Sequence, residues 1–387
     1  MIPHPDEVVK VLRRRGFAVD EVAPSKPPIR RGLEQVKIML EGEARSAVIA
    51  VPDHTRPVPV EKVLDLLIPA LEERGVSRDS LLVIFATGTH EMKSEEEAER
   101  MGRWLGKVKF KVHNCRAPHT YVGTTPRGLR VEVDEDFAAA DLKVTVGLVA
   151  PHPWAGFSGG NKVVLPGVSS IDTVVDHHVK WYRSGRSGVL ESNVFREEIE
   201  AAGRLAGVDY ALNLVVDRNR RVAYASWGDP LTSFHECANF TSQLYVRRVA
   251  GPYDLVIAYA EPLDLNLYQA TKALEHAAAV ASKGGRIVLI TRCTDGYGSR
   301  EFELFAKMDK EEVVEAIEER RIRSLVPALV ALVMKEICEK YEVYLLTEAK
   351  FEGLRGVKTV RTLAECLAFG EKALVIREGG FTAPYCA

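Results

Sequence analysis

The sequence contains an apolar run, LKVTVGLVA (residues 142–150), that leads into a segment rich in reactive side chains, HPWAGFSGGNKVVLPGVSSIDTVVDHH (residues 152–178). An apolar run with β-branched residues is typical of a buried strand in a parallel sheet. The segment after it holds a histidine, a glycine-rich turn that ends in a lysine, and a histidine pair. We therefore expect a strand that delivers a binding or catalytic site at its carboxyl end.

Two earlier segments repeat this arrangement of strand, loop and helix. SAVIAV (46–51) predicts a buried strand followed by a helix over 60–74, and LLVIFA (81–86) predicts a strand followed by an acidic helix over 93–105. The connecting loops are PDHTRPVP and TGTHE. Loops at the carboxyl ends of strands are where ligands usually bind in α/β folds.

These loops carry the first candidate site residues, which are Asp53, His54, Thr55 and Arg56 after the first strand, His90 after the second, and His152 after the third. If the three strands are neighbours in one parallel sheet, the loops open on the same edge and converge. The simpler alternative is that Asp53 and Thr55 cap the next helix, that Arg56 is solvated, and that His90 is an ordinary loop residue.

The glycine-rich turn is a candidate anion site. Ser158, Gly159 and Gly160 can turn tightly and present bare backbone N–H groups to a phosphate, because glycine has no Cβ to block its approach. Lys162 follows, either as a charge partner for that phosphate or as a nucleophile if burial lowers its pKa. An ordinary glycine turn with a solvated lysine is the alternative.

The strand and helix pattern restarts after Gly251-Pro252, which follows an expected helix over 234–249. We therefore predict an N-terminal catalytic and cofactor-binding domain over residues 1–250 and a smaller C-terminal domain over residues 251–387, whose tail could return to the first domain. The predicted fold class is α/β, with two α/β sandwich domains, mainly parallel sheets, and the active site in the cleft between them.

Gln269 and Lys272 lie three residues apart in LYQATKALEHAA, so on a helix they share a face. An amide and an ammonium group there would recognise a carboxylate or hydroxyl in the cleft. Closure of the cleft would complete the site, with a hinge over 250–266 and a second crossing near Gly379-Gly380. An exposed pair on a surface helix is the simpler alternative.

Composition excludes several classes of function. The chain has 387 residues, 46% of them hydrophobic, and a formal net charge of −2, which argues against nucleic acid or an anionic membrane as the main partner. No apolar run approaches the length of about 18 residues that a membrane span needs. The six cysteines form no C-x-x-C pair, so we expect reduced thiols in a cytoplasmic protein.

Taken in chain order, five motifs resemble the nickel-pincer lactate racemase family. They are DHTRP at 53–57, GTH at 88–90, HPWAGFSGGNKVVLPG at 152–167, His178 sixteen residues beyond Lys162, and LYQATK at 267–272. The resemblance covers about residues 50–275, and the order and spacing of the motifs make chance agreement a poor explanation.

The resemblance implies a cofactor and its attachment. Members of this family hold Ni(II) in a pincer made from a pyridinium mononucleotide whose sulfur-containing arm is joined to a lysine, here Lys162. His178 would be the protein ligand to nickel, and one imidazole with soft sulfur donors suits square-planar Ni(II). His177 is less suited, since neighbours on a helix point about 100° apart. The nucleotide phosphate would contact the 158–160 turn and the Asp53–Arg56 loop.

The resemblance also implies the reaction. His90 and His152 match the two acid/base histidines, which take the hydroxyl proton of either enantiomer while its hydride moves to the cofactor. Arg56, Gln269 and Lys272 match the substrate-binding residues. The implied activity is racemisation or epimerisation of a lactate-like 2-hydroxy carboxylate by reversible hydride transfer, and the implied partners are cofactor-synthesis and nickel-insertion proteins.

The chain departs from the family pattern at one point. Lactate-specific members place a tryptophan from the second domain near the substrate, whereas the last tryptophan here is Trp227. The identity of the 2-hydroxy acid is therefore open. Two other functions fit the same residues: a Schiff-base lyase or aldolase that uses Lys162 directly without metal, and a non-catalytic carrier of the mononucleotide.

Overall fold

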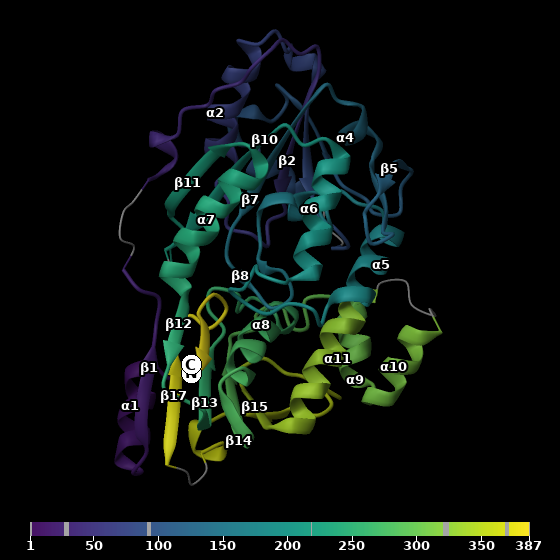
Figure 1. Cartoon of the computed structure of the whole chain (residues 1–387). Helices are drawn as coiled ribbons and strands as arrows, with labels where there is room; N and C mark the ends of the chain where they lie inside the picture. Colours follow the sequence, from purple (N-terminus) through teal and green to yellow (C-terminus); the bar gives the residue numbers. More distant parts are fainter. Residues whose placement is uncertain are drawn as a thin grey trace. The chain divides into compact units, whose positions relative to one another are not determined.

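The computed structural model of the chain describes residues 2–26, 31–90, 94–217, 219–319, 325–367 and 371–386. Figure 1 shows its helices and strands. The chain divides into two compact units: unit 1 comprises Met1–Lys26, Pro151–Pro153 and Ser242–Ala387, and unit 2 comprises Pro27–Ala150 and Trp154–Thr241. Each unit is built on a six-stranded sheet, and among the described residues the only antiparallel pairing in these two sheets is between β10 and β11. The predicted α/β class with mainly parallel sheets is confirmed.

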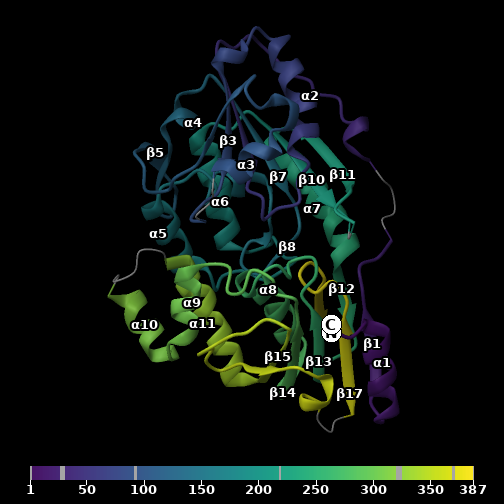
Figure 2. The ribbon, with the colours of Figure 1, turned by 180° about the vertical axis from the view of Figure 1, so that it is seen from behind.

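Unit 2 has the strand order β11-β10-β7-β2-β3-β4. Its strands are β2 (Ala47–Pro52), β3 (Leu81–Ala86), β4 (Lys109–Val112), β5 (His119–Thr124), β6 (Arg130–Asp134), β7 (Leu142–Leu148), β9 (Gly156–Phe157), β10 (Tyr210–Val216) and β11 (Val222–Gly228). Its helices are α2 (Val60–Glu72), α3 (Ser94–Arg100), α4 (Glu135–Ala139), α5 (Ile171–Trp181), α6 (Val194–Ala206) and α7 (Pro230–Tyr245), whose last turn from Ser242 is grouped with unit 1. Its 3-10 turns are η1 (Leu33–Gln35), η2 (Arg78–Ser80), η3 (Gly102–Trp104) and η4 (Gly160–Val163). The view in Figure 2 shows α3 near β3, and the guanidinium of Arg100 lies 5.5 Å from the centre of the Phe85 ring.

The central strands of unit 2 are apolar because helices cover both faces of a parallel sheet. All residues of β2 before Pro52 are buried, and β7 is buried except for Lys143. In the parallel pairings β2 with β3 and β2 with β7, the carboxyl ends of the three strands lie at one edge of the sheet. The condition for the three predicted loops to converge is therefore met.

Unit 1 has the strand order β1-β17-β13-β14-β15-β16. Its strands are β1 (Ala18–Val22), β8 (Pro151–His152), β12 (Val246–Val249), β13 (Tyr253–Tyr259), β14 (Ala281–Ile290), β15 (Glu342–Leu346), β16 (Lys358–Val360), β17 (Lys372–Ile376) and β18 (Ala383–Cys386). Its helices are α1 (Pro5–Arg14), α8 (Leu267–Ala278), α9 (Arg300–Lys307), α10 (Lys310–Glu318) and α11 (Leu325–Lys340), with the 3-10 turn η5 (Leu363–Glu365).

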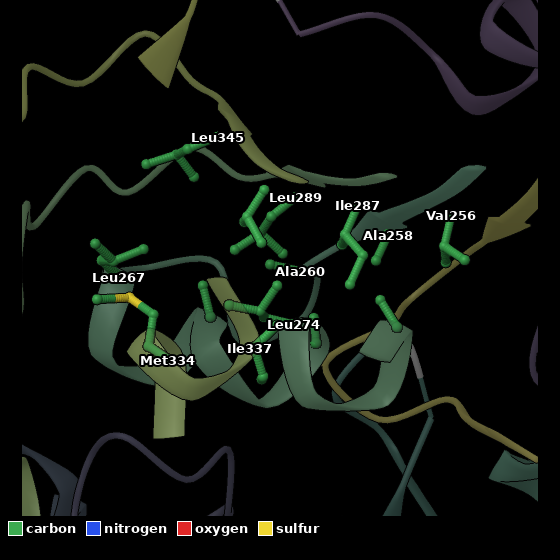
Figure 3. Packing of buried hydrophobic residues seen from close by; sticks show 14 of the residues in the cluster. Val256, Ala258, Ala260, Leu267, Leu274, Ile287, Leu289, Met334, Ile337 and Leu345 are labelled. Carbon is green, nitrogen blue, oxygen red and sulfur yellow. The ribbon is translucent and has the colours of Figure 1, made fainter. Parts of the chain in front are cut away.

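Alternate residues of β13 face opposite sides of the unit 1 sheet, as the period of a strand requires. Val256 and Ala258 pack with Leu274 of α8, whereas Leu255 and Ile257 belong to the cluster that includes residues of α1. Figure 3 shows the side of the sheet that α8 and α11 cover, where Leu274 points toward the strands. The sheet of unit 1 thus has a hydrophobic core on each face.

Two segments of unit 1 differ from the sequence-based expectation. The N-terminal residues, expected in the domain over 1–250, pack with the C-terminal part because β1 pairs in parallel with β17. The helix expected over 234–249 ends at Tyr245, and its last four residues form β12, which pairs in parallel with β18 of the tail. The valines at both ends of β12 suit this extended conformation.

Candidate active site

The loop after β2 places Asp53 against His90 from the loop after β3. The carboxylate of Asp53 is buried, and its Oδ2 lies 2.8 Å from Nδ1 of His90. Its Oδ1 accepts a hydrogen bond of 3.0 Å from the Thr55 N–H and a second from the Thr55 hydroxyl, while Nη1 of Arg56 donates to that hydroxyl at 2.9 Å. Asp53 therefore orients His90 and does not cap α2, which begins at Val60.

The charge state of Asp53 determines how His90 is held. Burial opposes ionisation, but the charge and hydrogen bond of His90 together with Arg56 and Thr55 outweigh it and hold the pKa of the Asp53 carboxyl well below its usual range. An ionised carboxylate only accepts hydrogen bonds, so Nδ1 of His90 must donate. The neutral ring then carries its hydrogen on Nδ1 and its lone pair on Nε2, as a general base requires.

His54 contacts helix α3 through Glu97, whereas its neighbour Asp53 contacts His90. Its backbone N–H and its ring Nδ1 both donate to Oε1 of the buried Glu97, at 2.8 and 3.0 Å. His152, the other predicted acid/base residue, lies in β8 and is grouped with unit 1. Its spacing from His90 stays a prediction, as does the cofactor contact of His54.

Lys162 lies in η4 with its ammonium nitrogen 5.5 Å from the centre of the Phe195 ring. Burial, followed by the charges of Arg196 and Arg56, lowers the pKa of Lys162 to about 7. Its nitrogen forms no hydrogen bond or ion pair with any residue that the structure describes. A large fraction of this amine is therefore neutral and nucleophilic near neutral pH.

The glycine-rich turn before Lys162 uses its donors within the protein. The Ser158 N–H donates to the carbonyl of Ala150 at 2.8 Å, its hydroxyl donates to the carbonyl of Leu148 at 2.7 Å, and the Gly160 N–H donates to Oδ1 of Asn213 at 2.8 Å. The expectation of bare N–H groups is thus wrong for Ser158 and Gly160. Phosphate binding by this turn stays a prediction and would need other donors.

The glycines of the turn are required by conformation and packing. Gly159 and Gly160 have φ angles of +79° and +57°, in the left-handed region that side chains disfavour. A Cβ on Gly159 would lie 2.5 Å from a methyl of Val149, and one on Gly160 would lie 2.6 Å from the guanidinium of Arg196 and 2.9 Å from Phe234. Close packing against its neighbours explains this turn without an anion.

Helix α6 holds the turn through a buried arginine. Nη1 of Arg196 donates to the carbonyls of Phe157 and Gly159 at 3.2 and 3.1 Å, and its Nη2 lies 2.5 Å from Oε1 of Glu200. Oε2 of Glu200 accepts from the amide of Asn161 at 2.7 Å. This network fixes the residues on both sides of the turn and places a cation near Lys162.

The two histidines at the end of α5 differ in which ring nitrogens have hydrogen-bond partners. Nε2 of His177 lies 2.9 Å from the carbonyl of Phe195, and Nδ1 of His178 lies 2.8 Å from the carbonyl of Val174, so both nitrogens must donate. Burial lowers the pKa of His177 to about 3 and also lowers that of His178, and the charge of Lys162 contributes to both shifts. Both rings are therefore neutral.

His178 is the better candidate ligand of the pair. Nδ1 of His177 lies 3.3 Å from Nδ1 of His178, so both ring nitrogens of His177 have partners. Nε2 of His178 keeps its lone pair and has no hydrogen-bond partner among the described residues. A neutral imidazole whose Nδ1–H is held by a backbone carbonyl is the usual form of a metal-binding histidine.

Gln269 and Lys272 lie together on α8 of unit 1. The Lys272 ammonium donates to Oε1 of Gln269 at 2.9 Å, and the Gln269 N–H donates to Oδ1 of Asn266, which caps the helix. The prediction that the two side chains share a face is confirmed by this contact. Their approach to the residues of unit 2 stays a prediction.

Two structural features are absent from the described residues. No helix in this part of the chain is long and apolar enough to cross a membrane. No group of three or more His, Cys, Asp or Glu side chains in the described ranges is arranged to hold a metal ion.

Comparisons with known proteins identify the family. Residues 9–189 match the family model of the lactate racemase N-terminal domain, and residues 250–374 match that of the lactate racemase C-terminal domain. The chain is 29% identical over 365 residues to the lactate racemase of Thermoanaerobacterium thermosaccharolyticum, covering 89% of this chain and 85% of that protein. It is 27% identical over 332 residues to the lactate racemase of Lactiplantibacillus plantarum, covering 82% and 77%.

Solved structures agree with the sequence matches. The lactate racemase apoprotein from T. thermosaccharolyticum superposes with a TM-score of 0.80 at 28% identity, over 89% of this chain and 87% of that chain. A Thermotoga maritima protein superposes with a TM-score of 0.69 at 21% identity, over 89% and 94%, and this likeness concerns the fold alone. The chain therefore belongs to the lactate racemase family and is a racemase.

Proposed function

We propose that the chain racemises a 2-hydroxy acid of the lactate type, with His90 and His152 as acid and base and a nickel-pincer pyridinium mononucleotide joined to Lys162. The observation that carries the proposal is the pairing of Lys162, whose amine has a pKa of about 7, with His178, whose Nε2 lone pair has no partner among the described residues. Both side chains border the ring of Phe195, 5.5 Å from the Lys162 nitrogen and 5.0 Å from the His178 ring.

The residues present fit such a group. Lys162 would form its covalent link because a neutral amine can attack an activated acyl carbon of the cofactor arm, whose activating group then leaves. His178 would bind the metal through Nε2. The names of the relatives, both lactate racemases, support a 2-hydroxy acid as substrate. When bound, the cofactor would supply an electron-poor ring that accepts the α-hydrogen of the substrate as hydride and returns it.

The protein's own part in the reaction is proton transfer and charge compensation. His90 would take the hydroxyl proton of one enantiomer at Nε2, and the Asp53 carboxylate 2.8 Å from Nδ1 would stabilise the resulting imidazolium. His152 would serve the other enantiomer, because a racemase needs a base for each. Arg56, Gln269 and Lys272 would bind the substrate carboxylate and hydroxyl, which arrive as hydrogen-bond acceptors.

The lowered pKa of Lys162 would also suit a Schiff-base enzyme, so the test must separate the two functions. Active protein is purified from its native host, its nickel content is determined by metal analysis, and the mass of the Lys162 peptide is measured after digestion. We expect a cofactor-sized adduct on Lys162 and bound nickel, and Lys162→Ala should lack both and be inactive. Lys180→Ala, at an exposed position of α5, is the matched control.

Two results would reject the proposal. Full activity of Lys162→Ala would rule out the covalent cofactor, and trapping of substrate on Lys162 by borohydride in nickel-free protein would favour the Schiff-base enzyme. A carrier function is tested with His90→Ala, which should bind the cofactor but lose activity if His90 transfers the proton.

A further inference from the structure

Helix α3 contributes a fully buried carboxylate to the loop after β2. Glu97 has no exposed surface, although it lies in the acidic sequence SEEEAER. Its Oε1 accepts from the backbone N–H of His54 at 2.8 Å and from the ring Nδ1 of His54 at 3.0 Å. One carboxylate therefore holds both the chain and the side chain of the residue that follows Asp53.

Arg100, one turn further along α3, completes this contact. Its Nη1 lies 2.5 Å from Oε2 of Glu97 and donates to the carbonyl of Pro52 at 2.8 Å, while its Nη2 lies 3.5 Å from the carbonyl of Val58. The ion pair therefore touches the residues on both sides of Asp53 and the end of the loop.

The ion pair joins a fully buried carboxylate to a guanidinium that is only partly exposed, so desolvation opposes it. Desolvation of two charges commonly offsets their attraction, so apolar residues of the same volume would stabilise the fold as well or better. The pair does fix the orientation of the groups it joins, because the hydrogen bonds between a carboxylate and a guanidinium form only in defined geometries. In this loop the side chain that must be oriented is Asp53, whose carboxylate oxygen lies 2.8 Å from Nδ1 of His90.

We propose that Glu97 is a positioning residue for His90, which acts by holding the loop over 52–58 so that Asp53 keeps its hydrogen bond to the His90 ring. The inference rests on the proposed function only in taking His90 as an acid/base residue. Glu97 bonds to His54 and to Arg100, which in turn donates to the carbonyl of Pro52, so its effect on Asp53 passes through the backbone of Pro52 and His54.

The first test uses cofactor-free protein and does not depend on activity. Nitrogen-15 NMR of the histidine side chains reports whether Nδ1 of His90 carries its hydrogen and how fast that hydrogen exchanges with water. In Glu97→Gln the amide cannot satisfy both His54 and the Arg100 guanidinium, since one end of the amide is a donor. We expect the Nδ1–H of His90 to exchange at least about tenfold faster than in the wild type, because its acceptor is no longer fixed.

The second test is kinetic. A misplacement of a catalytic group by about 1 Å can cost up to roughly 100-fold in rate. We therefore expect kcat of cofactor-loaded Glu97→Gln to fall by about tenfold to 100-fold with KM changed by less than about threefold. Combined with Asp53→Asn, Glu97→Gln should add almost nothing, since residues that act through one another are not additive. Glu99→Gln, an exposed neighbour on α3, is the matched control.

The outcomes separate the inference from the proposed function. Unchanged exchange of the His90 Nδ1–H in folded Glu97→Gln overturns the positioning role, whatever the reaction is. An equal loss of kcat in the Asp53→Asn background also overturns it. Full activity of His90→Ala would instead refute the acid/base assignment and leave the NMR result standing. If Glu97→Gln does not fold, Arg100→Lys takes its place, because one ammonium cannot hold Glu97 and Val58 together.

Discussion

The pKa of Lys162 makes the sharpest prediction. With a pKa of about 7, roughly half of this amine is neutral at pH 7, whereas an ordinary lysine with a pKa near 10.5 is neutral in only about three molecules in ten thousand. The reactive fraction is therefore raised by roughly a thousandfold. The perturbation that tests the cause is Arg56→Met, which removes one of the two cations that depress this pKa.

The assay is competitive labelling of cofactor-free protein with an amine reagent between pH 5.5 and 9.5, followed by peptide mapping. Labelling of Lys162 should rise with pH and level off above a midpoint near 7, and Arg56→Met should move this midpoint upward. A midpoint above pH 9 in the wild type would refute the reasoning that burial and two arginines make Lys162 a nucleophile.

The lowered pKa of Lys162 should also make the free energy of unfolding depend on pH. The folded-state pKa lies below the unfolded value of 10.5, so the unfolded chain binds more protons between pH 7 and 10.5, and stability rises with pH across that window. A shift of this size corresponds to up to about 5 kcal/mol. Lys162→Met should therefore be more stable than the wild type at pH 6 by a few kcal/mol, and the gain should shrink toward pH 10.

Three further predictions follow from the site. His178→Ala should lose nickel while Lys162 can still carry its adduct, which metal analysis and peptide mass would show. Loss of the adduct as well would contradict a role of His178 that is confined to metal binding. Gly160→Ala should lower the free energy of unfolding by about 2 to 4 kcal/mol and so unfold at a lower urea concentration, because its Cβ would lie 2.6 Å from Arg196 at a φ of +57°. An unchanged urea midpoint would mean that the turn can rearrange to accommodate the Cβ. Asp53→Asn should lower kcat by about 100-fold or more through loss of the carboxylate on His90, measured by polarimetry, and a loss confined to KM would contradict that role.

The sheet of unit 2 could be predicted because its strands are buried on both faces. The predicted strands at 46–51, 81–86 and 142–150 correspond to β2, β3 and β7, and each is an almost continuous apolar run. Strand β1 was not found, since AVDEV has a single buried residue, Val22, and lies at the edge of its sheet. Strand β12 lies where the sequence predicts the end of a helix, because its pairing with the tail is distant in sequence.

The site was only partly predictable. The approach of the Asp53 loop to the His90 loop follows from adjacent parallel strands and is predicted by the sequence, whereas the hydrogen bond between the two side chains is known only from the structure. Glu97 could not, since an acidic residue in the first turns of a helix ordinarily faces solvent, and only its contacts with His54 and Arg100 reveal its burial. The sequence also does not show that the N–H groups of Ser158 and Gly160 bond within the protein, because their acceptors on Ala150 and Asn213 are brought near only by the fold.

The most direct test of the central claim is the fate of the α-hydrogen during racemisation in heavy water. The C–H bond beside a carboxylate is too weak an acid for a histidine to deprotonate. In the proposed mechanism the histidines therefore act on the hydroxyl, and the α-hydrogen moves as hydride, which does not exchange with water. It predicts racemised 2-hydroxy acid with almost no deuterium at the α-carbon, and α-deuterated substrate in ordinary water that reacts more slowly and keeps its label. Extensive deuterium at the α-carbon, in product or in substrate recovered early, would contradict it and indicate proton transfer between two bases.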